Sequence, residues 1–397
     1  MSNEPNILLC DKNDWYEIID GKKKWNEDKV NNFWASIWSD LEKLYKENSK
    51  ILIEYKNVKF PKFQASEEDQ QKNFIFVTNE KIEPQLCFYF EETEIIFDHC
   101  DFLDEADFHQ YSFKQKVSFK VCNFKSSLVL PKLNINELNF FKCNFGQNDL
   151  TIHRSVFKSY LLIAGCTEIK TLNISESTFE DIADFRASTF QTIDAHLTVF
   201  KKMAIFIKTT FTEDVEFKLS IFEEITMFRD SIFEKNLNLR DAIFNKSALF
   251  IGIVAQVNRE TARIIKDTFE KQNNIIEANR FYAIEMRERK KELNIYKNPI
   301  QFIVFYAHWI SSNHSQNWFF ALLWILTLAI LGNENSFCNS IACFYFSDNK
   351  LDLMANSFKD MLKFNGTNIT MYLLIIKLFM GYMIYQFIIS IRQNTRR

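Results

Sequence analysis

The sequence predicts a mainly β chain built around a parallel β-solenoid with about 22 residues per coil. The first observation is compositional, because 42 of the 397 residues are Phe while only 7 are Gly and 5 are Pro. The second is that Phe recurs at alternating steps of five and six residues from 97 to 124, a spacing that neither a helix nor a simple strand produces. The third is a set of cysteines separated by 22, 21 and 23 residues: Cys100, Cys122, Cys143 and Cys166. An internal repeat of this length indicates a solenoid.

The N-terminal region, residues 1–84, is expected to form a helical cap. From Trp25 to Asn48 the apolar residues recur at threes and fours, which predicts an amphipathic helix. The ends of a solenoid expose stacked backbone edges that need a cover. We therefore expect Trp34 and Trp38 to pack on the first coil, and the alternative is that the same aromatic face binds a partner.

The solenoid itself is placed at residues 85–256, with one large ring directed inward from each short extended segment. Phe222 and Phe233 share a step of eleven residues, so they should lie half a coil apart. Between about 146 and 178 most of the inward positions are aliphatic, which predicts a distorted coil. The expected structural ladder comprises Phe102, Phe124, Phe145, Phe211, Phe222, Phe233 and Phe244.

The cysteines of the repeat are expected to be free and buried. Cys100, Cys122 and Cys143 each stand two residues before a Phe, where a small apolar side chain fits. The sequence has no CxxC pair, and no His lies at ligand spacing from any Cys, so neither a metal site nor a cofactor is expected. Asp or Asn precedes the ring, where its side chain can bond the backbone of a turn.

The triplets Cys100-Asp101-Phe102, Cys122-Asn123-Phe124 and Cys143-Asn144-Phe145 resemble the repeat of the pentapeptide-repeat family. The resemblance covers roughly residues 85 to 255, and this chain departs from the family pattern by a sixth residue in alternate repeats. It implies a right-handed, four-sided parallel β-solenoid with Phe or Leu rings stacked along its axis. Fold alone carries no function in this family.

Residues 257–295 are predicted to form a helical hairpin. Asn258 or Thr261 can cap a first helix that ends near Glu270, and a second helix runs from about Ile275 to Leu293. The pair resembles the hairpin that often follows the repeats in membrane-associated bacterial members of the family. Its charged end, residues 287–291, either is solvated or contacts lipid headgroups.

Residues 296–397 are predicted to be a membrane region with spans at about 317–332 and 371–391 and an outward loop at 333–370. The first apolar run is shorter than the ~20 residues that cross a bilayer, and the apolar segment 300–310 could lie in the interface or extend it. In the second span, Lys377 and Gln386 suit either a pore lining or a helix contact. Cys338 and Cys343 in the loop could pair in an oxidising compartment.

Charge predicts the topology and the location. Lys and Arg precede the first span and follow the second, so the positive-inside rule places both termini and the solenoid in the cytoplasm. The expected location is the bacterial inner membrane, with a multi-pass chain in contact with the lipid bilayer. The transmembrane helices could also associate into a homo-oligomer.

The function predicted from these features is a non-catalytic scaffold that binds an unknown protein partner. A two-span channel or sensor regulated by the solenoid is the alternative, although the loop has no TxGYG-like filter. Residues 81–255 contain 19 basic and 25 acidic side chains, a charge too mild for the polyanion mimicry of soluble family members, so nucleic acid is not an expected partner. No nucleophile elbow or phosphate-binding loop occurs, and we do not expect an enzyme.

Overall fold

The computed structural model describes residues 15–47, 52–62, 93–107, 113–130, 134–331 and 371–395. The chain divides into two compact units, Met1–Thr261 and Ala262–Arg397. The predicted outward loop, with Cys338 and Cys343, lies outside the described residues.

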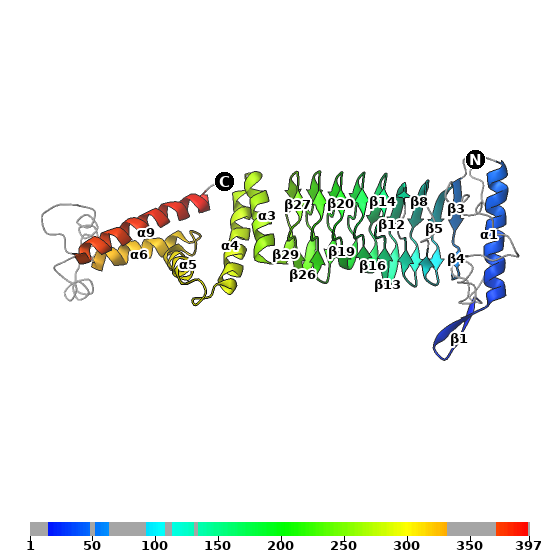
Figure 1. The fold of residues 1–397 in the computed structure, drawn as a ribbon, viewed down its shortest axis with the longest axis horizontal. Helices are drawn as coiled ribbons and strands as arrows, with labels where there is room; N and C mark the ends of the chain where they lie inside the picture. Colours follow the sequence, from blue (N-terminus) through cyan, green and yellow to red (C-terminus); the bar gives the residue numbers. More distant parts are fainter. Residues whose placement is uncertain are drawn as a thin grey trace, which may run out of the picture. The chain divides into compact units, whose positions relative to one another are not determined.

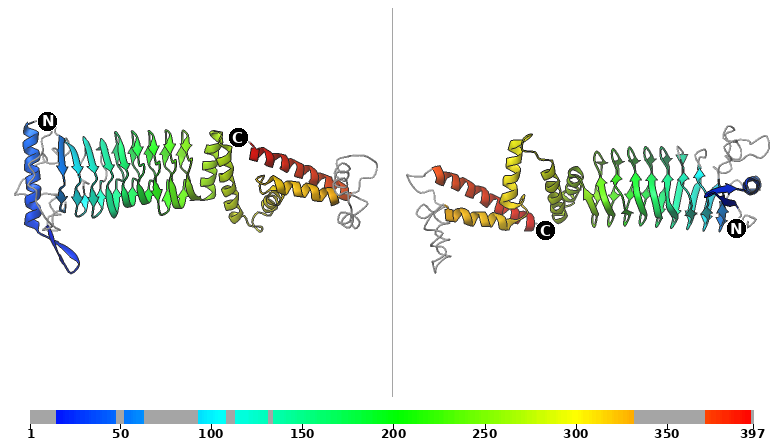
Figure 2. Two further views of the ribbon diagram at one scale, coloured as in Figure 1. Left: turned by 180° about the vertical axis from the view of Figure 1, so that it is seen from behind. Right: turned by 90° about the horizontal axis from the view of Figure 1, so that it is seen from below.

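The first unit contains a parallel β-solenoid of about seven turns with about 22 residues per coil, as the repeat predicts. Its short strands stack coil on coil (Figure 1), and the same stacking is visible from behind and from below (Figure 2). A nine-stranded sheet forms one face among the described residues. Its strands are β3 (Leu52–Lys56), β5 (Glu94–Asp98), β8 (Lys116–Lys120), β12 (Glu137–Phe141), β15 (Leu161–Ala164), β18 (Ala183–Asp184), β21 (Ala204–Ile205), β25 (Thr226–Met227) and β28 (Ala248–Leu249).

Two further parallel sheets complete the described coils. The twelve-stranded sheet contains β4 (Lys59–Phe60), β6 (Asp101–Phe102), β7 (Ala106–Asp107), β9 (Asn123–Phe124), β10 (Leu128–Val129), β13 (Asn144–Thr151), β16 (Thr167–Asn173), β19 (Thr189–Asp194), β22 (Thr210–Phe211), β23 (Val215–Glu216), β26 (Ile232–Asn238) and β29 (Val254–Val257). The six-stranded sheet contains β11 (Asn134–Ile135), β14 (Val156–Phe157), β17 (Thr178–Phe179), β20 (Val199–Phe200), β24 (Ile221–Phe222) and β27 (Ile243–Phe244).

The coil predicted to be distorted is irregular only at its start. β13 pairs with β16 through register shifts on both sides of Asn148. Gly146 and Gln147 have φ of 52° and 66° there, which is left-handed backbone. Further along, Val156 pairs with Thr178 in regular register. The prediction of distortion up to residue 178 was therefore too broad, because the strands after the register shifts pair regularly.

The corners of the coils use residues with left-handed backbone. One row of such corner residues runs through His99, Val121, Lys142, Gly165, Ala187, Lys208, Asp230 and Gly252, one per coil. A second row runs through Arg154, Glu176, Leu197, Leu219 and Asp241. Residues with a side chain pay about 1–2 kcal/mol for this conformation. The stack is therefore stabilised elsewhere, in its core and its cross-coil hydrogen bonds.

The N-terminal segment forms a hairpin, β1 (Tyr16–Ile19) with β2 (Lys22–Trp25), followed by α1 (Glu27–Glu47). α1 lies beside β3 and β4 (Figure 1). Its Phe33 and Trp34 rings lie 5.8 and 6.0 Å from the Phe60 ring, and the indole N–H of Trp34 donates to the Lys62 carbonyl at 3.1 Å. The side chain of Trp38, predicted to lie on the same face, is outside the described part of the helix.

The helical hairpin begins where the sequence predicts it. α3 (Arg259–Lys271) has Asn258 as its cap, because the Asn258 Oδ1 accepts from the Thr261 N–H at 2.8 Å. Of the two candidates, Thr261 has another use: its hydroxyl accepts from the Leu239 N–H at 2.9 Å. α4 (Ile275–Glu292) follows and is capped by Asn274.

The second unit continues with α5 (Pro299–Ser312), α6 (Trp318–Leu331) and α9 (Met371–Thr395). α6 and α9 pack through a small core that includes Ile325, Ala329, Ile376 and Met380. By length and composition, one helix of the described residues could cross a membrane, Leu374–Gln393, with a mean hydropathy of 1.8. α6 covers the first predicted span but has 14 residues, about 21 Å at 1.5 Å per residue, and contains a shorter apolar helix at Trp318–Ala329.

Candidate functional site

The predicted Phe ladder is divided between two faces of the solenoid. Phe102 and Phe124 stack at 4.8 Å between ring centroids, and Phe124 and Phe145 at 4.6 Å, all in the twelve-stranded sheet. Phe211 and Phe233, at 4.8 Å, continue this column on later coils of the same sheet.

Phe222 and Phe244 belong instead to the six-stranded sheet and stack at 4.8 Å. Phe222 and Phe233 thus lie on different faces, which fits their half-coil separation in the sequence. The predicted ladder residues of the twelve-stranded sheet and Phe222 are buried, and Phe244 is half-buried. The rings form the packed core of the stack and leave its outward side chains to make any contact with a partner.

The cysteine column is inward-facing, free and buried. Each thiol donates to a carbonyl of the preceding coil, Cys100 to Tyr55 at 3.2 Å and Cys122 to Phe97 at 3.3 Å. The neighbouring Cys122 thiol and burial together raise the pKa of Cys100, and burial raises the pKa of Cys143. A raised pKa suppresses the reactive thiolate, so we expect Cys100 and Cys143 to react slowly in the folded protein.

The same column continues with hydroxyls in the later coils, which sequence reasoning missed. The Ser188 hydroxyl donates to the Ile163 carbonyl at 2.8 Å, and the Thr209 hydroxyl to the Phe185 carbonyl at 2.9 Å. Ser231 makes the equivalent bond to Phe206. From Cys100 to Ser231 the column therefore holds small side chains with a hydrogen-bond donor. The donor is a thiol in the earlier coils and a hydroxyl in the later ones.

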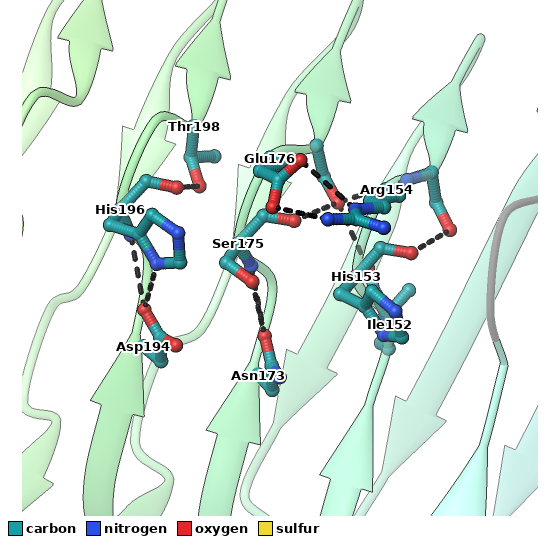
Figure 3. A network of polar contacts seen from close by, with 11 residues as sticks. Ile152, His153, Arg154, Asn173, Ser175, Glu176, Asp194, His196 and Thr198 are labelled. Carbon is teal, nitrogen blue, oxygen red and sulfur yellow. Dashed lines mark hydrogen bonds and ion pairs between the residues drawn. The ribbon is translucent and has the colours of Figure 1, made fainter.

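The candidate contact surface is a corner of three successive coils, residues 152–154, 173–176 and 194–198, which we call the polar corner (Figure 3). Its exposed side chains include Arg154 and Glu176. It lies between strands of the twelve-stranded sheet and strands of the six-stranded sheet. Left-handed backbone at Arg154, Glu176 and Leu197 turns the chain at each level. Equivalent backbone positions are thereby repeated from coil to coil.

The polar corner carries paired charges and one carboxylate–imidazole pair. The Arg154 guanidinium binds both carboxylate oxygens of Glu176, at 2.9 and 3.0 Å (Figure 3). This contact lowers the pKa of Glu176 and raises that of Arg154. On the next coil, the Asp194 Oδ1 lies 2.7 Å from the His196 Nδ1. Both pairs are solvent-accessible, so a molecule that bound along the polar corner would contact them.

The hydroxyls near His196 are committed to structural bonds. The Thr198 hydroxyl is buried and donates to the Ile174 carbonyl at 2.9 Å, and the Ser175 hydroxyl donates to the Asn173 Oδ1 at 2.7 Å. A nucleophile needs its hydroxyl bonded to the base that activates it. Neither of these two hydroxyls donates to the imidazole of His196.

A second polar group, Tyr160–Asp184–Arg186, clamps adjacent coils. The fully buried Asp184 carboxylate accepts from the Tyr160 hydroxyl at 2.9 Å and from the Arg186 Nε at 2.7 Å. Burial and this hydrogen bond raise the pKa of Tyr160 to about 12. Asp184 Oδ1 also accepts from the Arg186 N–H at 3.1 Å, which is the turn role expected of an Asp placed before a ring.

Other outward charges pair across coils in the same manner. These pairs are Lys116–Glu137, Lys201–Glu180, Lys235–Glu213 and Lys246–Glu224. Each pair neutralises a carboxylate that would otherwise add to an acidic surface. In the described part of the chain, no group of three or more His, Cys, Asp or Glu residues could hold a metal ion.

The two polar residues predicted in the second span both lie on α9. Gln386 is buried, and its Oε1 accepts from the hydroxyls of Ser312 and Ser315 at 3.0 and 3.1 Å. These serines belong to the end of α5 and the turn that follows it. Lys377 is half-buried on α9. Gln386 therefore makes a helix contact within the second unit.

No family model, curated protein or solved structure matches this chain.

Proposed function

We propose that this chain is a membrane-anchored pentapeptide-repeat protein that acts as a non-catalytic scaffold for a protein partner. In this proposal the solenoid is right-handed and four-sided, α1 caps its first coil, and the polar corner carries the partner contact. The apolar run 317–332 and α9 are the two spans. The solenoid and both termini lie on the cytoplasmic side of the bacterial inner membrane.

The observation that carries the anchoring is the exposed apolar surface of α9. Leu378, Phe379 and Ile388 are each more than half exposed on a helix long enough to cross a bilayer. Soluble proteins rarely leave so many large apolar side chains in water along one helix. A lipid bilayer would cover them, and Arg392 at the end of the helix suits the cytoplasmic interface.

The outward charges of the solenoid favour a protein partner over nucleic-acid mimicry. A polyanion mimic needs unpaired carboxylates with a strong field, whereas Glu176, Glu180 and Glu213 each pair with a basic side chain on a neighbouring coil. A mixed row of charges and hydrogen-bonding groups suits a protein surface.

A two-span channel is less well supported by the same unit. Polar side chains of a pore must face an open path, while Gln386 is hydrogen-bonded to two serines of its own chain. The buried Gln386 supports packing between α9 and the α5–α6 turn. We therefore keep the scaffold as the proposed function.

Anchoring is tested by alkaline carbonate extraction of membranes that contain the full-length protein. The protein should stay in the pellet, and truncation after Leu293 should release a soluble solenoid. Release of the full-length protein by carbonate alone would contradict the anchor.

Partner binding is tested by affinity purification from detergent-solubilised membranes with charge-reversal variants. Arg154→Glu should remove the partner because it breaks the Arg154–Glu176 pair and reverses a charge in the polar corner. Lys246→Glu is the matched control, since it reverses the charge of another exposed cross-coil pair. Equal recovery of the same proteins with both variants would exclude the polar corner as the contact surface.

A further inference from the structure

α5 presents an apolar stripe that the described residues leave uncovered. Ile300, Ile303, Val304 and Ile310 recur at helical spacing, and Ile300 is 76% exposed. The buried residues of α5 are Phe305 on the other side of the helix and Ser311 and Ser312 at its C-terminal end. In most amphipathic helices the apolar stripe is buried, whereas the apolar stripe of α5 is exposed.

The basic end of α4 stacks on the aromatic residues of α5. The Lys290 ammonium lies 4.4 Å from the Trp309 ring centroid and 5.7 Å from that of Tyr306. The Arg289 guanidinium lies 6.0 Å from the Phe305 ring. These contacts hold two cations against the aromatic residues of α5.

At the C-terminal end of α4 and the segment that follows it, basic side chains outnumber acidic ones. Residues 287–297 contain five basic and two acidic side chains, a net charge of 5 − 2 = +3. Glu288 is paired with Lys291 at 2.7 Å. Among the residues that the structure describes, no carboxylate pairs with Arg289 or Lys290. A cation stacked on an aromatic face keeps donors free for another anion.

A helix with an exposed apolar stripe, Trp and Tyr rings and adjacent cations has the properties of a helix that lies in a membrane interface. The stripe enters the boundary of the acyl chains, the rings lie at headgroup level, and the cations meet the lipid phosphates. A protein partner would need acidic groups matched to a short apolar stripe. A bilayer that contains anionic lipid supplies both features over the whole length of α5.

We propose that α5 lies in the cytoplasmic membrane interface and that Arg289 and Lys290 bind the phosphate of an anionic phospholipid. The inference rests on the membrane anchoring proposed above and adds the lipid class and the site. Basic side chains next to an anionic surface each strengthen binding several-fold, so two of them should favour an anionic lipid over a zwitterionic one by about tenfold or more.

The test is native mass spectrometry of the full-length protein in detergent with equimolar phosphatidylglycerol and phosphatidylcholine. The wild-type protein should retain phosphatidylglycerol about tenfold over phosphatidylcholine, and rising salt should reduce the preference. The double substitution Arg289→Gln with Lys290→Gln should bring the ratio close to one. The control, Lys201→Gln with Lys246→Gln, removes two exposed charges from the solenoid and should leave the preference unchanged.

Each result decides the proposal. Equal retention of both lipids by the wild-type protein, or an unchanged ratio in the Arg289 and Lys290 variant, would overturn it. The double substitution Ile303→Gln with Val304→Gln should weaken the retention of phosphatidylglycerol. If it instead converts an oligomer to a monomer and leaves the ratio of the two retained lipids unchanged, the stripe packs against a second copy of the chain and the proposal is wrong.

Carbonate extraction tests the membrane anchor, and lipid preference tests the lipid site, so the two proposals can fail independently. A protein that resists carbonate but retains both lipids equally would be anchored without the lipid site. A protein that carbonate releases would not be anchored, and the site would then be tested by sedimentation with phosphatidylglycerol and phosphatidylcholine vesicles. Preferential sedimentation with phosphatidylglycerol would support the site, and equal sedimentation would refute it.

Discussion

Replacement of Phe222 by Ala tests whether stacked rings stabilise the solenoid coil by coil. Phe222 is fully buried between Phe200 and Phe244, with ring centroids 4.9 and 4.8 Å away and nearly parallel planes. Removing a buried Phe costs about 3–5 kcal/mol, through lost burial and the cavity that remains. Two ring contacts are lost together, so we expect a loss of about 4 kcal/mol, the middle of this range.

Hydrogen exchange with mass spectrometry measures this loss locally. Because each coil contacts only its neighbours, amides near Phe200, Phe222 and Phe244 should exchange up to about 10³-fold faster, while those of β5 and β8 should not change. Phe141→Ala is the matched control, since this ring is 43% exposed and its removal should cost less than about 0.5 kcal/mol. Equal effects of the two substitutions, or uniform loosening along the whole stack, would refute the stacked-core argument.

Five further substitutions test the cysteine column, the left-handed corners and the helix contact. Cys122→Ser should lower the free energy of unfolding by about 1 kcal/mol or less, because Ser188 and Thr209 fill equivalent sites. Cys122→Leu should lower it by about 1–3 kcal/mol, because the larger side chain overpacks the site. Denaturant unfolding measures both. Alkylation of Cys122 in the native protein should be slow at pH 8, because its raised pKa keeps the thiol protonated; fast labelling would show that the column is open to solvent. Val121→Gly should stabilise the folded protein by about 0.5–1 kcal/mol, because it replaces a β-branched residue with φ of 53° by the residue found at equivalent corners. Gly165→Val should destabilise the folded protein for the same reason. The opposite order of melting temperatures would contradict this prediction. Gln386→Leu should lower the free energy of unfolding by about 1–3 kcal/mol, because it leaves two buried serine hydroxyls without their acceptor. The loss should be seen as faster hydrogen exchange at the end of α5. Unchanged exchange there would show that this contact does not hold the helices together.

The core of the solenoid could be predicted from the sequence because a stacked ring leaves a periodic signal. Each coil returns the chain to the same position, so Phe102 and Phe124 must be separated by one coil length. Cysteine is rare enough that its recurrence at Cys100 and Cys122 also stood out. Coil length and inward face follow directly from these two residue types.

The hydroxyl half of the column could not be found in the same manner. Ser and Thr are common and occur on every surface, so Ser188 and Thr209 carry no periodic mark of their own. Only the hydrogen bond to the preceding coil identifies them as equivalents of Cys122. The signal that could have found them is the continuation of the 22-residue step past Cys166.

The left-handed corners were also invisible in the sequence. Such backbone is usually marked by Gly or Asn, whereas the corners here include Val121, Lys142 and Leu197. The stacked coils on both sides impose the conformation, and Gly165 and Gly252 are the two glycines in one of these rows. Tertiary constraint overrides local preference at these positions.

The second unit shows the limit set by long-range contacts. The segment 300–310 was assigned either to the interface or to the first span, and the structure separates it as α5 by a left-handed turn at Asn313, His314 and Ser315. The run of polar residues at 311–317 was the available signal. The contact between Gln386 and Ser312 joins residues 74 positions apart, and no spacing rule predicts it.

In the proposed scaffold, the outward rows of the solenoid and not its core would distinguish the partner. Since Cys122 and Ser188 serve the same purpose, the interior does not distinguish one coil from another. The polar corner does, because it presents Arg154, Glu176 and His196 on successive coils (Figure 3). Neighbouring strands of a sheet lie about 4.8 Å apart. A partner that binds along the axis would contact several levels and would respond to each of these side chains. A partner that binds the end of the stack would meet one coil and would be indifferent to Arg154→Glu, so the same variant that tests the surface also gives the direction of approach.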